Sequence, residues 1–125
     1  MNTLIFHCSC LDGNYTLKAE WTADELTYTV DTDIEELSGK TGELDPESVK
    51  GFLDLLEKAG IPHWERRYVP EGSGIEDAVR WNVEYVSGEE TYRSSGEETF
   101  LPYGYEALID ALESMDKDVR YFSYR

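Results

Sequence analysis

Two histidines and two cysteines are the residues of this chain whose types could support nucleophilic or metal chemistry. His7, Cys8 and Cys10 lie close together, and His63 is the only other histidine. A thiol beside a histidine can act as a nucleophile, and all four side chains are potential zinc ligands. However, zinc motifs typically use C-x2-C pairs, whereas a single residue separates these cysteines. On a strand, Cys8 and Cys10 would share one face and His7 would point to the other. We therefore favour cysteines packed as small apolar residues over a catalytic pair or a zinc site.

An acidic segment begins with the spacing of a calcium-binding loop. Asp31, Asp33 and Glu35 stand at alternate positions, as the first ligands of such a loop do. The pattern then fails, because Glu36 occupies the position of the required glycine and Gly42 that of the bidentate glutamate. We favour a solvated acidic loop over weak calcium binding.

The sequence lacks the motifs of common catalytic and phosphate-binding sites. It has no Gly-x-Ser-x-Gly nucleophile elbow. The run Gly72-Ser73-Gly74 is not followed by the lysine of a phosphate-binding loop. The only basic dipeptide is Arg66-Arg67, for which we favour salt bridges with acidic neighbours over anion binding. We expect a protein that is not an enzyme and that needs no cofactor.

Net charge is the largest signal in the composition. The 125 residues include 27 acidic and 11 basic side chains, which gives a formal net charge of -16. Direct binding to nucleic acid or to an anionic membrane calls for Lys and Arg, so the charge argues against both partners. Hydrophobic residues make up 40% and aromatic residues 13% of the chain, which argues against disorder.

The length suits a single domain over residues 1–125. No stretch approaches the roughly 20 apolar residues that a membrane span needs. Met1 to Cys10 contains no basic residue and no long apolar run, so it does not resemble a secretion signal. We expect a cytoplasmic protein with reduced thiols.

Alternation of apolar and polar residues predicts several β-strands. The clearest runs are Tyr15 to Trp21 and Ala78 to Val86, in which every second residue is apolar. Further strands are expected at Thr3 to Cys8, Leu26 to Thr32, Trp64 to Val69 and Glu90 to Ser95. Asp31 to Asp45 is expected to be a polar connection, and the aromatic tail Val119 to Tyr124 to be a strand or a packed extension.

Two helices are predicted, at about 46–59 and 103–115. Asp45-Pro46 is a helix-start signal, because Asp caps free amides and Pro fits the first helical position. Gly60 is the expected C-terminal cap of the first helix, and Pro102 opens the second. The predicted fold is α+β: an antiparallel sheet of about five to seven strands with both helices on one face.

A Trp-bearing strand, a turn and a second helix form a recognisable series. The run Trp81-Asn82-Val83-Glu84-Tyr85 is followed by Gly88, by Ser94-Ser95-Gly96, and by Pro102 with its helix. This series resembles a motif in a family of small uncharacterised bacterial proteins. The Asp45-Pro46 helix and Trp64 resemble the same pattern, so that the similarity covers roughly residues 45–115. The resemblance implies an α+β arrangement. It carries over neither an activity nor any catalytic residue.

The leading functional hypothesis is a non-catalytic acidic protein that binds a basic surface of a partner protein. Its sharpest version is a nucleic-acid mimic that inhibits a nucleic-acid enzyme, as phage-borne inhibitors do; immunity proteins against basic toxins use the same physics. Alternate residues of a strand lie roughly 6.6 Å apart, a spacing close to that of phosphates along one nucleic-acid strand. The expected binding residues are Asp31, Asp33, Glu35, Glu36, Glu43, Glu89, Glu90, Glu97 and Glu98.

The alternative is a housekeeping domain that self-associates, as a homodimer for example, with acidity serving only solubility. An exposed sheet edge or an aromatic patch would form that interface. The aromatic residues considered for the patch are Tyr92, Phe100, Tyr103, Tyr121, Phe122 and Tyr124.

Overall fold

The computed structural model describes residues 2–10, 13–22, 25–33, 40–68, 80–97, 102–117 and 119, with only the backbone given for Cys10, Lys40 and Glu97. These residues form an α+β fold, as the sequence predicts. The strands are β1 (Asn2–Cys10), β2 (Gly13–Trp21), β3 (Leu26–Thr32), β4 (Lys40–Leu44), β5 (Arg67–Tyr68), β6 (Arg80–Ser87) and β7 (Glu90–Glu97). The helices are α1 (Pro46–Ala59), the short 3-10 helix η2 (Ile61–His63) and α2 (Tyr105–Glu113). No helix among the described residues is long and apolar enough to cross a membrane.

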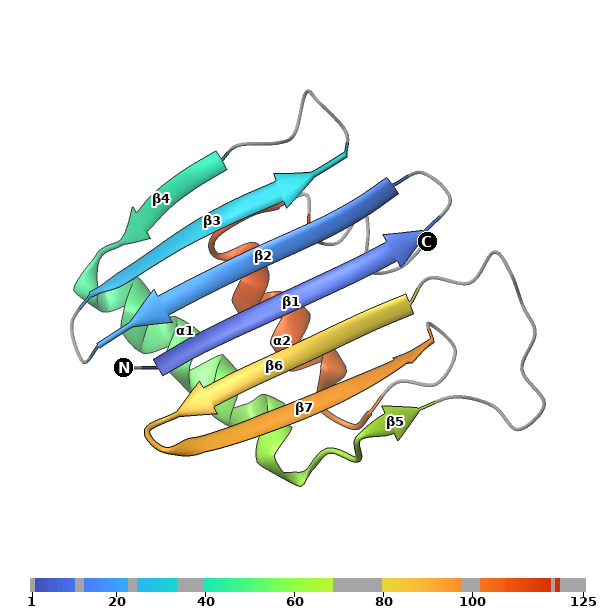
Figure 1. Cartoon of the computed structure of the whole chain (residues 1–125). Coiled ribbons are helices and arrows are strands. Elements are labelled where there is room, and N and C mark those ends of the chain that lie inside the picture. The colour runs from blue at the N-terminus through green and yellow to red at the C-terminus, as the bar shows by residue number, and fades with distance from the viewer. Residues whose placement is uncertain are drawn as a thin grey trace.

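The seven strands form one sheet in the order β4-β3-β2-β1-β6-β7-β5 (Figure 1). All neighbouring strands are antiparallel except β5, which pairs with β7 in parallel through two residues. Strand β1 lies between β2 and β6, so the N-terminal meander and the later β6–β7 hairpin meet at the centre of the sheet. Paired residues can therefore be followed without a break across the sheet, from Asp31 on β3 to the arginines at β5.

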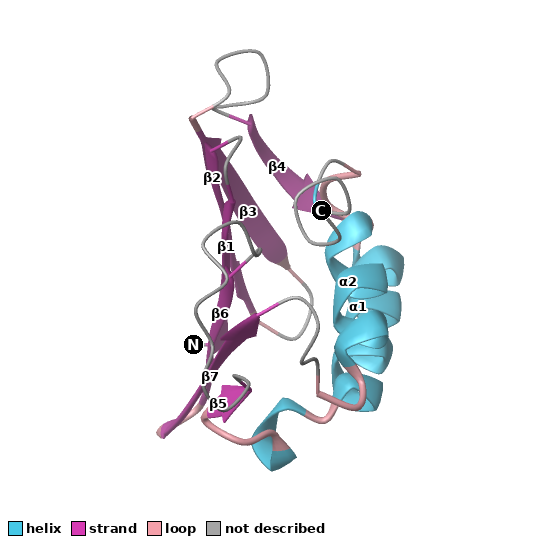
Figure 2. Ribbon diagram, turned by 90° about the vertical axis from the view of Figure 1, so that its right-hand side faces the viewer, coloured by secondary structure: helices cyan, strands magenta, loops and turns pink. Residues whose placement is uncertain are grey.

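Both helices lie on the same face of the sheet, as predicted (Figure 2). The apolar side chains of the alternating strands fill the space between the sheet and the helices. Leu4 and Phe6 of β1, Leu17 of β2 and Trp81 of β6 are all buried. Val49 and Phe52 of α1, and Leu108 and Ile109 of α2, cover them from the helix side. This face of the sheet therefore forms the hydrophobic core together with the two helices.

Local signals define α1. The Asp45 carboxylate accepts a hydrogen bond from the Ser48 amide at 2.7 Å, and Gly60 ends the helix in the left-handed conformation, with φ +67°. Helix α2 is two residues shorter at each end than predicted, because Tyr103 and Gly104 form a turn before it and Ser114 caps its end. A side chain at Gly104 would overlap the carbonyl group of Ala59, so glycine allows the two helices to meet there.

Two predicted segments are corrected by the structure. The connection from Asp31 to Asp45 contains the edge strand β4, which forms because its backbone pairs with β3. The strand predicted at Trp64 to Val69 shortens to β5, and it follows the helix η2 rather than starting at Trp64. The tail lies outside the described residues except for Val119, which is buried.

Candidate functional site

The sheet face opposite the helices is the candidate functional surface, and we call it the open face. Figure 1 looks onto it, and none of the described elements covers it in Figure 2. Antiparallel sheets commonly leave one face in water, where polar side chains replace apolar ones. Here the outward positions of β1 are Thr3, Ile5, His7 and Ser9, all of them half-buried. Only Ile5 among them is apolar, so the face is polar at its centre.

The register aligns polar side chains in rows across the open face. In one row Asp31 of β3 pairs with Thr16 of β2, Thr16 with His7 of β1, His7 with Asn82 of β6, and Asn82 with Ser95 of β7. The His7 ring nitrogen Nδ1 lies 2.7 Å from the Thr16 hydroxyl. The row therefore begins with a carboxylate at one side of the sheet and ends beside the arginines at the other.

Carboxylates gather on the β2–β4 side of the open face, which we call the acidic half: Glu20, Asp31, Asp33 and Glu43. Asp31 and Glu43 are exposed, and neither forms an ion pair within the described residues. Glu20 lies 3.2 Å from the ammonium group of Lys18. Among the described side chains, this half therefore presents four carboxylates against one amine.

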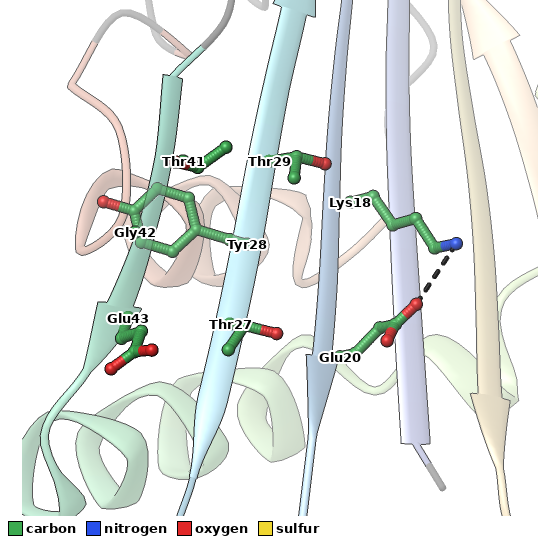
Figure 3. A pocket seen from close by; sticks show the side chains of 8 residues that line it. All are labelled: Lys18, Glu20, Thr27, Tyr28, Thr29, Thr41, Gly42 and Glu43. Carbon is green, nitrogen blue, oxygen red and sulfur yellow. Dashed lines mark ion pairs between the residues drawn. The ribbon is translucent and has the colours of Figure 1, made fainter.

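A shallow groove of about 510 Å3 runs across the acidic half, between β2 and β4. Figure 3 shows Lys18 and Glu20 from β2 on one side of it and Glu43 from β4 on the other. The ring of Tyr28 extends from β3 across Gly42: a Cβ at Gly42 would lie 2.6 Å from Cζ of that ring. Glycine at this position thus allows the ring to lie flat against β4.

Asp33 has a structural role in addition to its charge. Its Oδ2 atom accepts hydrogen bonds from the Asn14 amide at 3.1 Å and from the Asn14 side chain at 2.9 Å. These contacts fasten the end of β3 to the start of β2. Asp33 is therefore unsuitable for a test of binding alone.

The acidic residues expected to bind a partner do not form one continuous surface. Asp31, Asp33 and Glu43 lie on β3, just after it, and on β4, whereas Glu89 and Glu90 lie at the β6–β7 turn. The register places Asp33 and that turn at opposite ends of the sheet, about 25 Å apart along the strands at the usual rise per residue.

Three of the expected residues are not described, and a fourth is described only in part. Glu97 pairs with Arg80 in the backbone register at the same end of the sheet as Asp33. Glu35, Glu36 and Glu98 lie outside the described residues. The binding role of all nine acidic residues stays a prediction.

The histidines and the described cysteine do not meet. Cys8 is buried on the helix side of β1, whereas His7 points to the open face, as alternation predicts. His63 ends η2, in the turn that follows α1. Within the described ranges, no group of three or more His, Cys, Asp or Glu side chains is placed to hold a metal ion.

Four arginines lie on or beside strands β5, β6 and β7, at the far side of the sheet from the acidic half. The sequence did not predict this cluster. Arg67, Arg80 and Arg93 lie on β5, β6 and β7, and Arg66 directly precedes β5. Arg93 Nε lies 3.0 Å from Glu84 Oε2. The salt bridges expected for Arg66 and Arg67 are not found among the described residues. The Arg66-Arg67 dipeptide was the available signal, but its neighbours on β7 become visible only through the pairing of the strands.

The aromatic patch expected for self-association is only partly described. Tyr103 is 99% exposed, and it is the only large hydrophobic side chain fully exposed in the described part of the chain. Tyr92 is half-buried and stacks on Tyr85, with ring centroids 5.9 Å apart. Phe100, Tyr121, Phe122 and Tyr124 lie outside the described residues. The self-association interface therefore stays a prediction.

Comparison with known proteins assigns no family: no family model matches the chain, and no curated protein is significantly similar to it.

Proposed function

We propose that this protein is a non-catalytic interaction protein whose acidic half binds a basic surface of a partner protein. The observation that carries the proposal is the arrangement of the sheet: one face is filled by the helices, and the other is left open with Asp31 and Glu43 exposed on it. The cytoplasm, expected from the sequence, is the compartment in which we place the partner.

The physical basis is electrostatic attraction to carboxylates that neighbouring strands hold side by side. Strands β2, β3 and β4 hold the carboxylates at fixed spacing, so little conformational entropy is lost when a partner binds. Charge complementarity raises the association rate and makes binding sensitive to salt. An exposed ion pair contributes about 0.2–1 kcal/mol, so three pairs contribute roughly 0.6–3 kcal/mol, or about 3- to 150-fold in affinity.

The test compares two variants with the same change in net charge. The open-face variant carries Glu20→Gln, Asp31→Asn and Glu43→Gln. The control variant carries Glu47→Gln, Asp54→Asn and Glu57→Gln, at exposed positions of α1. Asp33 is left intact because it holds Asn14.

Each immobilised protein is exposed to cell lysate at low and at high salt, and retained proteins are identified by mass spectrometry. We expect the wild type and the control variant to retain the same basic protein at low salt and to release it at high salt. The open-face variant should retain much less of it. Equal loss in both variants would show that only overall charge matters, and the proposal would fail.

The finer version of the proposal is that the partner is a nucleic-acid enzyme whose substrate groove takes the acidic half. Asp31 and Asp33 lie two residues apart at the edge of the open face, which is the repeat that this version needs. A retained enzyme that is inhibited by the wild type, and released by its own nucleic acid, would support it. Association that consists only of this chain and persists at high salt would favour the self-association alternative instead.

A further inference from the structure

A hollow of about 520 Å3 lies on the open face at the opposite side from the acidic half. Its volume falls in the range of small-molecule sites. A smaller hollow of about 330 Å3 adjoins it and shares Arg66 and Arg93. We call the larger hollow the arginine groove; its lining residues are Ile5, His7, Arg66, Arg67, Asn82, Val83, Glu84, Arg93, Ser94 and Ser95.

The Ser-Ser-Gly run recognised in the sequence fixes the backbone that carries two of these arginines. The Ser94 hydroxyl donates to the Glu65 carbonyl at 2.6 Å, and the Ser95 amide donates to the Arg66 carbonyl at 2.9 Å. Gly96 allows β5 to pack closely, because a Cβ there would lie 2.6 Å from the Tyr68 carbonyl oxygen. The arginine segment is therefore held as an extra strand beside β7.

No described residue neutralises the charges of this segment. Arg66 and Arg67 have no ion pair among the described residues, although the chain has 27 acidic side chains and only 11 basic ones. Among the described residues, Glu84 is the only carboxylate that lines the groove, and Arg93 already pairs with it. Within the described part of the chain, two guanidinium groups are thus left to bind an anion from solution.

We propose that the arginine groove binds a small organic anion that carries a phosphate monoester group. Two guanidinium groups provide two positive charges and donors in the fork geometry that suits phosphate oxygens. Asn82 and Ser95 add polar groups, and Ile5 offers an apolar surface to the organic part of the ligand. The carboxylates of the acidic half lie on β2, β3 and β4, at least four strands from the arginine segment, or about 19 Å at the usual strand spacing. This exceeds the Debye length of about 8 Å at physiological salt, so their effect on the arginines is largely screened.

The test is an NMR titration of the labelled, full-length protein with phenyl phosphate, and with benzoate as the monoanionic comparison. We expect saturable shifts of the amides of Arg66, Arg67 and Ser95, with phenyl phosphate binding more tightly than benzoate. The absence of saturable shifts, or equal affinity for the two probes, would overturn the proposal.

Three variants identify the groups that bind. Arg66→Gln and Arg67→Gln should each lower the affinity for phenyl phosphate about tenfold. Each substitution removes a charge-assisted hydrogen-bond donor. Arg80→Gln is the matched control: it removes the same charge from an exposed site on β6 that does not line the groove. Its affinity should stay close to that of the wild type. Equal weakening in all three variants would mean that overall charge governs binding, and no groove would be needed.

A fourth variant separates this inference from the proposed function. The open-face variant at Glu20, Asp31 and Glu43 should bind phenyl phosphate at least as tightly as the wild type, because none of those residues lines the groove. Loss of phosphate binding in that variant would contradict the assignment to the arginines. The two proposals can therefore fail independently.

Discussion

The close packing of β5 on β7 can be tested by adding one methyl group at Gly96. A Cβ at this position would lie 2.6 Å from the Tyr68 carbonyl oxygen, 2.8 Å from the Tyr68 Cβ and 2.9 Å from Cζ2 of Trp81. Real Cβ atoms do not approach backbone or ring atoms so closely, so β5 must move. Overpacking of this kind typically costs about 1–3 kcal/mol. We expect Gly96→Ala to lower the free energy of unfolding by that amount.

Gly51→Ala is the matched control, because the same methyl group is added where nothing lies within 4 Å. Gly51 is exposed within α1. Alanine is favoured over glycine in a helix interior by about 1 kcal/mol. The same substitution should therefore stabilise the protein at position 51 and destabilise it at position 96.

Urea unfolding of the three proteins, followed by tryptophan fluorescence, measures the difference. Trp64 and Trp81 pack against each other with ring centroids 5.8 Å apart, close to the perturbed strand. We expect a gap of about 2–4 kcal/mol between the two variants. A Gly96→Ala protein as stable as the wild type would refute the close packing of β5, and with it the fixed position of Arg66 and Arg67.

Two further predictions concern hydrogen bonds to carboxylates. Tyr15→Phe removes the hydroxyl that donates to Asp116 Oδ2 at 2.8 Å, and Asp116 is only 6% exposed. We therefore expect the free energy of unfolding in urea to fall by about 1.5–3 kcal/mol. A decrease below about 0.5 kcal/mol would contradict this role. The Ser48 amide holds the pKa of Asp45 below its usual value of 3.8, so the charged cap stabilises the fold above that pH and loses its effect as the pH falls through the lowered pKa. The wild type should therefore be more stable than Asp45→Asn above pH 3.8, with the difference vanishing in stronger acid; a difference that is constant with pH would exclude this linkage.

The elements that the sequence predicted well are those defined by neighbouring residues. Helix α1 has its cap, its first-turn proline and its terminal glycine within the segment itself, and the predicted bounds of 46–59 are confirmed. Strand β3 is likewise confirmed at Leu26–Thr32, because alternation alone identifies it.

Strand β4 was missed and β5 was predicted too long, because both strands depend on distant partners. Strand β4 contains Gly42, a poor strand former, and exists through its pairing with β3 and the contact with Tyr28. Strand β5 is two residues long and is held by Ser94 and Ser95, almost 30 positions away in the chain. No local pattern carries that information.

The candidate site was predictable in its residue types and not in their arrangement. The sequence identified the acidic residues, but only the register shows that Asp33 and Glu89 lie at opposite ends of the sheet. The same register brings Arg66 and Arg67 beside Arg93. The overall acidic composition therefore does not indicate that one face carries both an acidic half and an arginine groove.

The most direct test of the proposed function is the affinity of the retained partner for the wild type, the open-face variant and the α1 control variant at two salt concentrations. We predict that the substitutions at Glu20, Asp31 and Glu43 weaken binding by about 3- to 150-fold at low salt and reduce its salt dependence. The control should match the wild type under both conditions. Equal affinity of the open-face variant and the control would contradict the assignment of binding to the open face.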